Sequence, residues 1–293
     1  MPAGRRSQAM RIDAHQHFWR LAERAGAWPP PTLAAIHRDF EPQDLAPLLQ
    51  AGGIDGTVLV QSLPTVAETR RLLALARTTR FVRGVVGWVD MKAPDAVDTI
   101  ADLARDPLLK GLRPMLQDLP DDDWIADPAT APAAQAMARY GLVFDALVLP
   151  RHLPALLTFA ARHPGLPMVV DHAAKPTIAR GQRQPWQDDL ARLAALPQVH
   201  CKLSGLLTEA GDRTQVEHLL PYVQALWSSF GPSRLLWGSD WPVLQLAGDY
   251  AGWLAMTAAL LAAVTPPASA DEAAAILGGN AVTLYRLQGP RPC

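Results

Sequence analysis

The feature of this sequence that most constrains its fold is a repeated alternation between short apolar runs and longer stretches with helical periodicity. Runs rich in valine and leucine, such as residues 58–60 and 169–170, are typical of parallel strands that are buried on both faces. Between the runs, apolar residues recur three and four positions apart, as at Leu72, Leu73 and Ala76, which predicts amphipathic helices. The alternation therefore favours βα units arranged around a parallel sheet.

The number of apolar runs points to a barrel. Strands are expected over residues 10–14, 56–60, 82–89, 110–114, 142–146, 167–170, 199–203 and 235–238. The clearest helices are expected over residues 66–78, 132–140, 150–162, 187–195, 214–230 and 250–263. Eight strands predict a single α/β domain of the (β/α)8 TIM-barrel type, for which this chain length is sufficient. An open, doubly wound sheet would show a similar alternation, but no GxGxxG motif follows the first strand, which counts against a dinucleotide-binding fold.

The composition indicates a globular chain that acts on a small molecule. Apolar residues make up 49% of the 293 residues, charged residues 19%, and the net charge is −1, so a nucleic-acid or anionic-membrane partner is not expected. No apolar run approaches the roughly 18 residues of a membrane span. The two cysteines, Cys201 and Cys293, provide no disulfide framework, which favours a reducing cytoplasm. We expect residues 1–9 to be a disordered N-terminal extension and residues 10–293 to form the barrel domain, while the oligomeric state stays open.

Chemically versatile side chains follow three of the expected strands. His15 and His17 end the first strand, and a spacing of two residues directs both side chains to the same side. His172 directly follows the sixth strand and Asp240 follows the eighth. Taken singly, these are equally explained as loop histidines and a turn aspartate. In a barrel, however, all three strand ends open onto one face, so we expect the four side chains to meet at the C-terminal mouth.

Asp240 has the sequence neighbours of a general base. Trp237 and Trp241 flank it in sequence, and we expect them to remove it partly from water. Partial desolvation raises the pKa of a carboxylate, which suits a group that takes a proton from water.

Four segments, in this order along the chain, resemble the amidohydrolase superfamily: DAHQHFW at residues 13–19, DHAAKP at 171–176, CKLSGL at 201–206 and GSDWP at 238–242. A closing segment, GNAVTLYRL at residues 279–287, is also similar to that family. More closely, the chain resembles the lactone-hydrolysing branch of amidohydrolase family 2, which includes fuconolactonase-like and rhamnonolactonase-like proteins. The resemblance runs from residue 11 to residue 287 and implies an amidohydrolase-type barrel.

The resemblance also implies roles for the residues at the mouth. His15 and His17 match the metal-binding pair of the first strand, His172 matches the histidine of the sixth strand, and Asp240 matches the aspartate that activates water. The chain departs from members with two metal ions, because its fifth strand has no histidine and its fourth offers only Lys110 in the sequence KGLRP. One divalent ion such as zinc, or catalysis without metal, fits this sequence better than a two-metal site.

Four further residues are candidates for binding substrate. Arg113 follows the fourth strand, where its guanidinium could hold a carboxylate or hydroxyl unless it forms a surface salt bridge. Gln61 ends the second strand and is either a hydroxyl ligand or a turn residue. Lys202 points into the barrel, as a buried ion pair or a substrate contact. Trp241 is a candidate for an apolar wall, and residues 28–32 and 117–127 for loops over the mouth.

The function that these observations favour is hydrolysis of a sugar lactone, such as L-fuconolactone, to the aldonic acid by water that Asp240 activates. One alternative is hydrolysis of an aromatic-pathway lactone, such as a pyrone dicarboxylate or a muconolactone, or a related decarboxylation. Substrates with several carboxylates call for several arginines, and Arg113 is the one arginine expected at the mouth. The second alternative is a sugar-binding barrel without catalysis, for which Asp240 would be dispensable.

Overall fold

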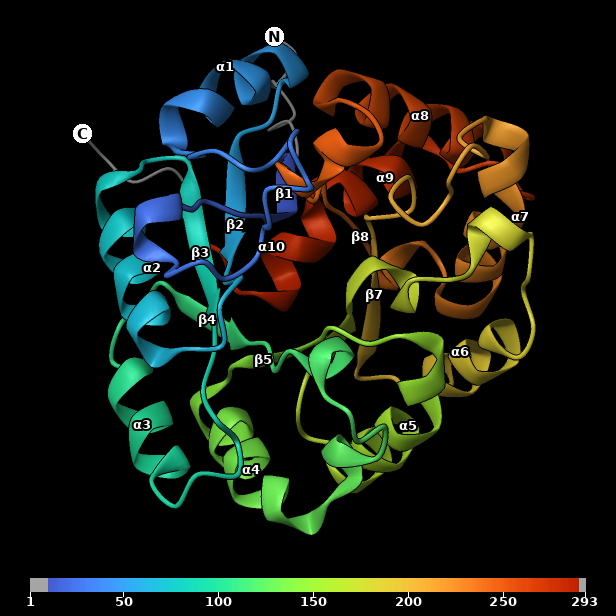
Figure 1. The fold of residues 1–293 in the computed structure, drawn as a ribbon. Coiled ribbons are helices and arrows are strands. Elements are labelled where there is room, and N and C mark those ends of the chain that lie inside the picture. Colours follow the sequence, from blue (N-terminus) through green and yellow to red (C-terminus); the bar gives the residue numbers. More distant parts are fainter. Residues whose placement is uncertain (1–9, 290–293) are drawn as a thin grey trace, which may run out of the picture.

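The computed structural model describes residues 10–289, which form a closed barrel of eight parallel strands surrounded by helices (Figure 1). Each strand pairs with the next in sequence, and a parallel bridge between Gln16 and Trp241 joins the first strand to the segment after the last. The strands are β1 (Ile12–Gln16), β2 (Gly56–Val60), β3 (Val82–Gly87), β4 (Leu109–Leu112), β5 (Val143–Ala146), β6 (Met168–Val170), β7 (Val199–Leu203) and β8 (Leu235–Trp237). The sequential order excludes a doubly wound sheet and confirms the predicted (β/α)8 barrel.

The helices pack around the outside of the barrel (Figure 1). They are α1 (Pro42–Gly52), α2 (Val66–Thr78), α3 (Ala96–Leu103), α4 (Ala131–Tyr140), α5 (Leu153–Arg162), α6 (Trp186–Ala194), α7 (Val216–Phe230) and α8 (Tyr250–Ala263), followed by α9 (Ala270–Ala274) and α10 (Asn280–Leu284). All six expected helices are present. Helix α1 was missed, although Glu41 and Asp44 form a capping box around its start and Pro42 occupies its first turn.

The C-terminal segment closes one end of the barrel. Apolar side chains inside the strands, among them Val58, Val169 and Leu236, pack with Leu284 and Tyr285 of the α10 region in one buried cluster. Figure 1 shows α10 lying within the ring of strands. Because this packing fills the N-terminal end, a ligand can enter only at the C-terminal mouth, where the strand-end residues lie.

The expected N-terminal extension at residues 1–9 lies outside the described residues, as do residues 290–293. Between residues 10 and 289, no helix has both the length and the apolarity to cross a membrane.

Candidate active site

Strand β1 carries two histidines whose rings meet at the mouth. As predicted, His15 and His17 lie on the same side, with their Nε2 atoms 3.2 Å apart. The strand ends two residues later than expected, so His15 lies within it and His17 follows directly. Nδ1 of His17 is 2.8 Å from the Val60 carbonyl, and Nδ1 of His15 is 3.4 Å from a carboxylate oxygen of Asp171. Because Nδ1 of His17 faces a carbonyl acceptor, its Nε2 lone pair is available to a ligand. Nδ1 of His15 also lies 3.2 Å from the Lys202 ammonium, and its Nε2 lies 3.4 Å from Nη1 of Arg113.

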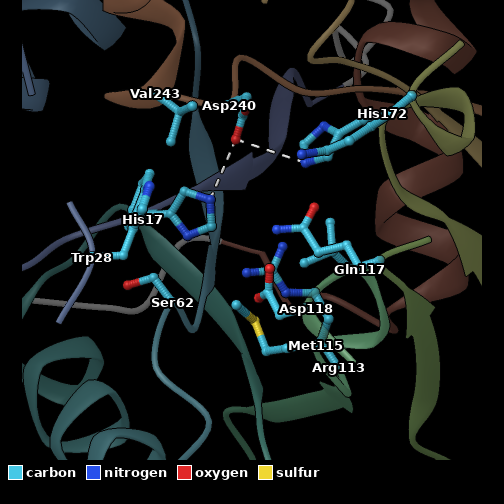
Figure 2. Close-up of a pocket in the computed structure, with 12 residues that line it drawn as sticks. His17, Trp28, Ser62, Arg113, Met115, Gln117, Asp118, His172, Asp240 and Val243 are labelled. Carbon is cyan, nitrogen blue, oxygen red and sulfur yellow. Dashed lines mark hydrogen bonds and ion pairs between the residues drawn. The ribbon is translucent and has the colours of Figure 1, made fainter. Parts of the chain in front are cut away.

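Asp240 joins this pair from the other side of the barrel seam. Its backbone N–H donates to the His15 carbonyl at 2.8 Å, which fixes the segment after β8 against β1. Its Oδ1 lies 3.3 Å from Nε2 of His17, 3.7 Å from Nε2 of His15 and 3.8 Å from Nε2 of His172. Figure 2 shows Asp240 between His17 and His172. The predicted convergence of strand ends one, six and eight is therefore confirmed.

His172 is presented by a left-handed turn. Residues 172–175 have φ values of 52°, 52°, 58° and 50° although none is glycine, a conformation that costs about 1–2 kcal/mol per residue. The surrounding structure holds the turn in place. Nδ1 of His172 is 2.9 Å from Ser204 Oγ, the Trp186 indole donates to the Ala173 carbonyl at 2.6 Å, and Gly205 lies against the imidazole ring. A strained backbone of this kind is retained only where surrounding contacts hold it in place, and such positions are common at functional sites.

Three of these side chains, His15, His17 and Asp240, provide a donor set for one divalent ion. Ligand atoms around a tetrahedral ion at about 2.0–2.1 Å lie roughly 3.3–3.4 Å from one another. The separations among His15 Nε2, His17 Nε2 and Asp240 Oδ1, 3.2, 3.3 and 3.7 Å, are close to that spacing. With its Nδ1 directed at the Val60 carbonyl, His17 turns an Nε2 lone pair toward Nε2 of His15, an arrangement that a cation stabilises. The site therefore fits a single zinc-like ion.

The charges at the site differ from the expectation in one respect. Burial raises the pKa of Asp240, but the nearby histidines, His172 foremost, outweigh burial and lower the pKa below its ordinary value. The expected rise was wrong because the neighbours that matter are histidines from other strands and not the adjacent tryptophans. Burial lowers the pKa of His172 to about 4 and that of His15 well below its ordinary value. At neutral pH Asp240 is ionised and both imidazoles are neutral.

A buried polar network lies beneath the histidines. The ammonium of Lys202 is 2.6 Å from Asp145 Oδ2, 2.9 Å from Asp171 Oδ1 and 3.2 Å from Nδ1 of His15. The Tyr285 hydroxyl donates to Asp145 at 2.7 Å from the closed end of the barrel. Burial lowers the pKa of Lys202, but the two carboxylates outweigh burial and raise it, so the lysine is charged. The sequence left Lys202 as either a buried ion pair or a substrate contact. In the structure Lys202 is fully buried and forms ion pairs with Asp145 and Asp171.

Above the histidines lies a cavity of about 220 Å³. It is lined by His17, Trp28, Ser62, Arg113, Met115, Gln117, Asp118, Leu147, His172, Lys175, Asp240 and Val243 (Figure 2). The two segments expected over the mouth both contribute, through Trp28 and through Gln117 and Asp118. Among the arginines of the described chain, only Arg113 lines this cavity.

Three of the four expected substrate ligands do not reach the cavity. Lys202 lies beneath it, and Gln61 is fully buried with its amide donating to the Arg113 carbonyl at 2.7 Å. Trp241 is 1% exposed and packs edge-on against Phe18 and Phe40. Each of these three residues is enclosed by protein atoms, so a role in binding substrate stays a prediction for them. Arg113 does line the cavity, although its guanidinium also contacts the Gln61 carbonyl and Asp171.

Several supporting residues were missed. Asp13 accepts hydrogen bonds from the Ser239 hydroxyl at 2.6 Å and the Tyr250 hydroxyl at 3.0 Å, which ties β1 to the Asp240 segment. Asp171 orients His15. Both aspartates belong to the motifs that contain the histidines, and this proximity was the available signal. Nothing in the sequence marked Trp28 or Asp118 individually, because they come from irregular loops.

A closed (β/α)8 barrel with three histidines and one aspartate gathered at its C-terminal mouth defines an enzyme of the metal-binding barrel hydrolase class. The sequence model of the family described as Amidohydrolase matches residues 12–287. The chain therefore belongs to the amidohydrolase family.

Relatives with sequences similar to this chain cover nearly its whole length. It is 57% identical over 283 residues to an L-fucono-1,5-lactonase of Burkholderia ambifaria, covering 96% of this chain and 97% of that protein. It is 37% identical to an L-fucono-1,5-lactonase of Burkholderia multivorans, covering 96% and 98%. A crystal structure of an amidohydrolase from Burkholderia multivorans with bound zinc is 36% identical, with a TM-score of 0.89 and coverage of 96% and 100%.

Proposed function

We propose that this protein hydrolyses a sugar lactone, such as L-fucono-1,5-lactone, to the corresponding aldonic acid. The observation that carries the proposal is an ionised carboxylate, Asp240, at the floor of a closed-ended cavity and within 3.8 Å of three imidazole nitrogens. The 57% identity to the Burkholderia ambifaria lactonase supports the substrate class, because it extends over nearly all of both chains.

In the proposed reaction, Asp240 accepts a proton from water as the water oxygen attacks the lactone carbonyl carbon. A bond forms between that carbon and the water oxygen, and the carbonyl oxygen takes up the negative charge. When the intermediate collapses, the bond between the carbonyl carbon and the ring oxygen breaks. Asp240 returns the proton to the departing ring oxygen, which gives the open-chain hydroxy acid.

His15 and His172 support this step in their neutral form. His15, His17 and Asp240 would hold one zinc ion with His172 beside them, and such an ion supplies Lewis-acid polarisation of the carbonyl. The zinc-containing Burkholderia multivorans structure supports the choice of metal. Independently of metal, His172 is kept in position by Ser204 and lies on the other side of Asp240 from His17 (Figure 2).

The cavity suits a neutral polyhydroxylated ligand. Ser62, Gln117 and Asp118 offer hydroxyl, amide and carboxylate groups that can hydrogen-bond to sugar hydroxyls, and Trp28 offers an apolar ring face. A pyrone dicarboxylate or muconolactone would bring additional carboxylates, whereas Arg113 is the single arginine among the lining residues described and is already bound to Asp171. This difference favours the sugar lactone. Participation in sugar-acid metabolism and a cytoplasmic location are parts of the same proposal.

Acid release tests the proposal. The parent protein and Asp240→Asn are followed with a pH indicator across fuconic, galactonic and rhamnonic lactones, with Asp188→Asn on the exposed face of α6 as the matched control. We expect rapid release by the parent and the control, and a loss of about 10²–10⁴-fold in Asp240→Asn. Release retained by Asp240→Asn would refute the role of Asp240 as base. Lactone binding without any release by the parent would favour the sugar-binding barrel, and pyrone and muconolactone substrates would then be tried.

A further inference from the structure

The left-handed turn at residues 172–175 delivers a second side chain to the cavity. Lys175 ends the turn at φ 50°, and its backbone N–H donates to the His172 carbonyl at 2.8 Å. In a turn closed by a bond between residues three apart, the first and last side chains lie over each other. Both His172 and Lys175 therefore line the cavity.

Lys175 is a cation at the cavity wall whose ammonium N–H groups have no acceptor within hydrogen-bond distance among the described residues. Within residues 10–289, the contact found for its ammonium group is Glu209 Oε1 at 3.9 Å, which is beyond hydrogen-bond distance. The guanidinium of Arg113, the other cation lining the cavity, is bound to the Gln61 carbonyl and to Asp171. An ammonium group has three protons to donate, so Lys175 can take an anionic oxygen without losing an existing bond.

Hydrolysis creates a need for such a cation. The lactone is neutral, but its product carries a carboxylate at the carbon that was attacked, which is next to the ionised Asp240. Two carboxylates at short range repel each other unless a cation lies between or beside them. Lys175 is held three residues from His172 on the same wall of the cavity, where it can approach the new carboxylate.

We propose that Lys175 binds the carboxylate of the aldonate product and is therefore a binding residue of this site. The inference rests on the proposed lactone hydrolysis for the identity of the ligand. It also explains why a lysine occupies a left-handed position that favours glycine: the strain is retained because the side chain has a function there.

Direct binding separates this role from a structural one. The metal-loaded parent, Lys175→Met and Lys175→Arg are titrated calorimetrically with L-fuconate and with L-fucitol, which replaces the carboxylate by a hydroxymethyl group. We expect Lys175→Met to bind L-fuconate roughly tenfold or more weakly, with L-fucitol binding unchanged within about twofold, and Lys175→Arg to retain most of the L-fuconate affinity. Equal weakening of both ligands, unchanged L-fuconate binding in Lys175→Met, or no L-fuconate binding by the parent would overturn the proposal.

The lactonase assay keeps the two proposals apart. If the parent releases acid from lactones but Lys175→Met binds L-fuconate normally, only the role of Lys175 fails. If the parent releases no acid but Lys175→Met selectively loses L-fuconate, the carboxylate site stands and the lactonase proposal fails.

A glycine variant tests the argument from strain. Lys175→Gly removes the same cation as Lys175→Met but relaxes the backbone, so its thermal midpoint should equal or exceed that of Lys175→Met while L-fuconate binding is lost in both. A midpoint of Lys175→Gly clearly below that of Lys175→Met would overturn the argument that strain is retained for function.

Discussion

The Gly205→Ala variant should fold and yet lose about two orders of magnitude in turnover. Gly205 has φ 64°, and a Cβ atom there would lie 2.6 Å from Nδ1 of His172 and 2.7 Å from Cγ. Non-bonded heavy atoms normally keep about 3.5 Å, so the imidazole has to move by about 0.9 Å. A displacement of about 1 Å in a reacting site costs on the order of 10²-fold in rate. The left-handed backbone should add about 1–2 kcal/mol of destabilisation.

Gly53→Ala is the matched control for this prediction. Gly53 has φ 63° after the last turn of α1, at the opposite end of the barrel, and the nearest atom to an added Cβ is Nη1 of Arg11 at 3.4 Å. It should therefore lose similar stability in a urea titration but keep the parent's kcat in the acid-release assay. If Gly205→Ala keeps the parent's kcat, or if both variants lose it equally, the reasoning from the position of His172 is refuted.

Two further predictions concern the buried charges and the metal. Lys202→Met should lower the free energy of unfolding by about 3–5 kcal/mol, because it leaves the buried carboxylate of Asp145 without a cation and that of Asp171 with Arg113 alone. As a control, Arg70→Ala breaks an exposed ion pair with Asp102 and should lower the free energy of unfolding by less than about 1 kcal/mol. If urea titration shows the same loss of stability for both variants, the prediction is contradicted. Zinc added to chelator-treated parent protein at 100 times the dissociation constant should stabilise it by about 2.7 kcal/mol. The double variant His15→Asn/His17→Asn should show no such gain in its thermal midpoint, and an equal gain would remove these histidines from the metal site.

The parallel strands could be predicted from the sequence because they are buried on both faces, whereas their closure into a barrel was implied mainly by the family resemblance. The strands β2 and β7 have the bounds that were expected. Strand β7 was predicted even though it contains the charged residue Lys202, because Lys202 lies between the apolar residues Cys201 and Leu203. Helix α3 was missed because its eight residues are too few for a clear periodicity.

The candidate site was predictable in its members but not in its electrostatics. His15, His17, His172 and Asp240 could be brought together by topology alone, because strand ends in a barrel share a face. The lowered pKa of Asp240 could not be foreseen, since it depends on distances to histidines more than sixty residues away in sequence. The orientation of Trp241 could not be foreseen for a related reason: its ring turns toward Phe18 and Phe40, away from the carboxylate beside it.

Backbone strain concentrates where the sequence was least informative. Among residues 10–289, non-glycine residues with positive φ are found at Asp240 and throughout residues 172–175, and otherwise only at Ala25 and Arg286. Local propensity disfavours each of these conformations, so no pattern of residue types predicts them. The barrel can hold them because hydrogen bonds from strands on both sides, such as that from Asp240 N–H to the His15 carbonyl, leave the strained segments no relaxed alternative. Lys175, which the motif alone did not single out, lies in one of these strained segments, and the carboxylate binding proposed for it is the function that the strain would serve.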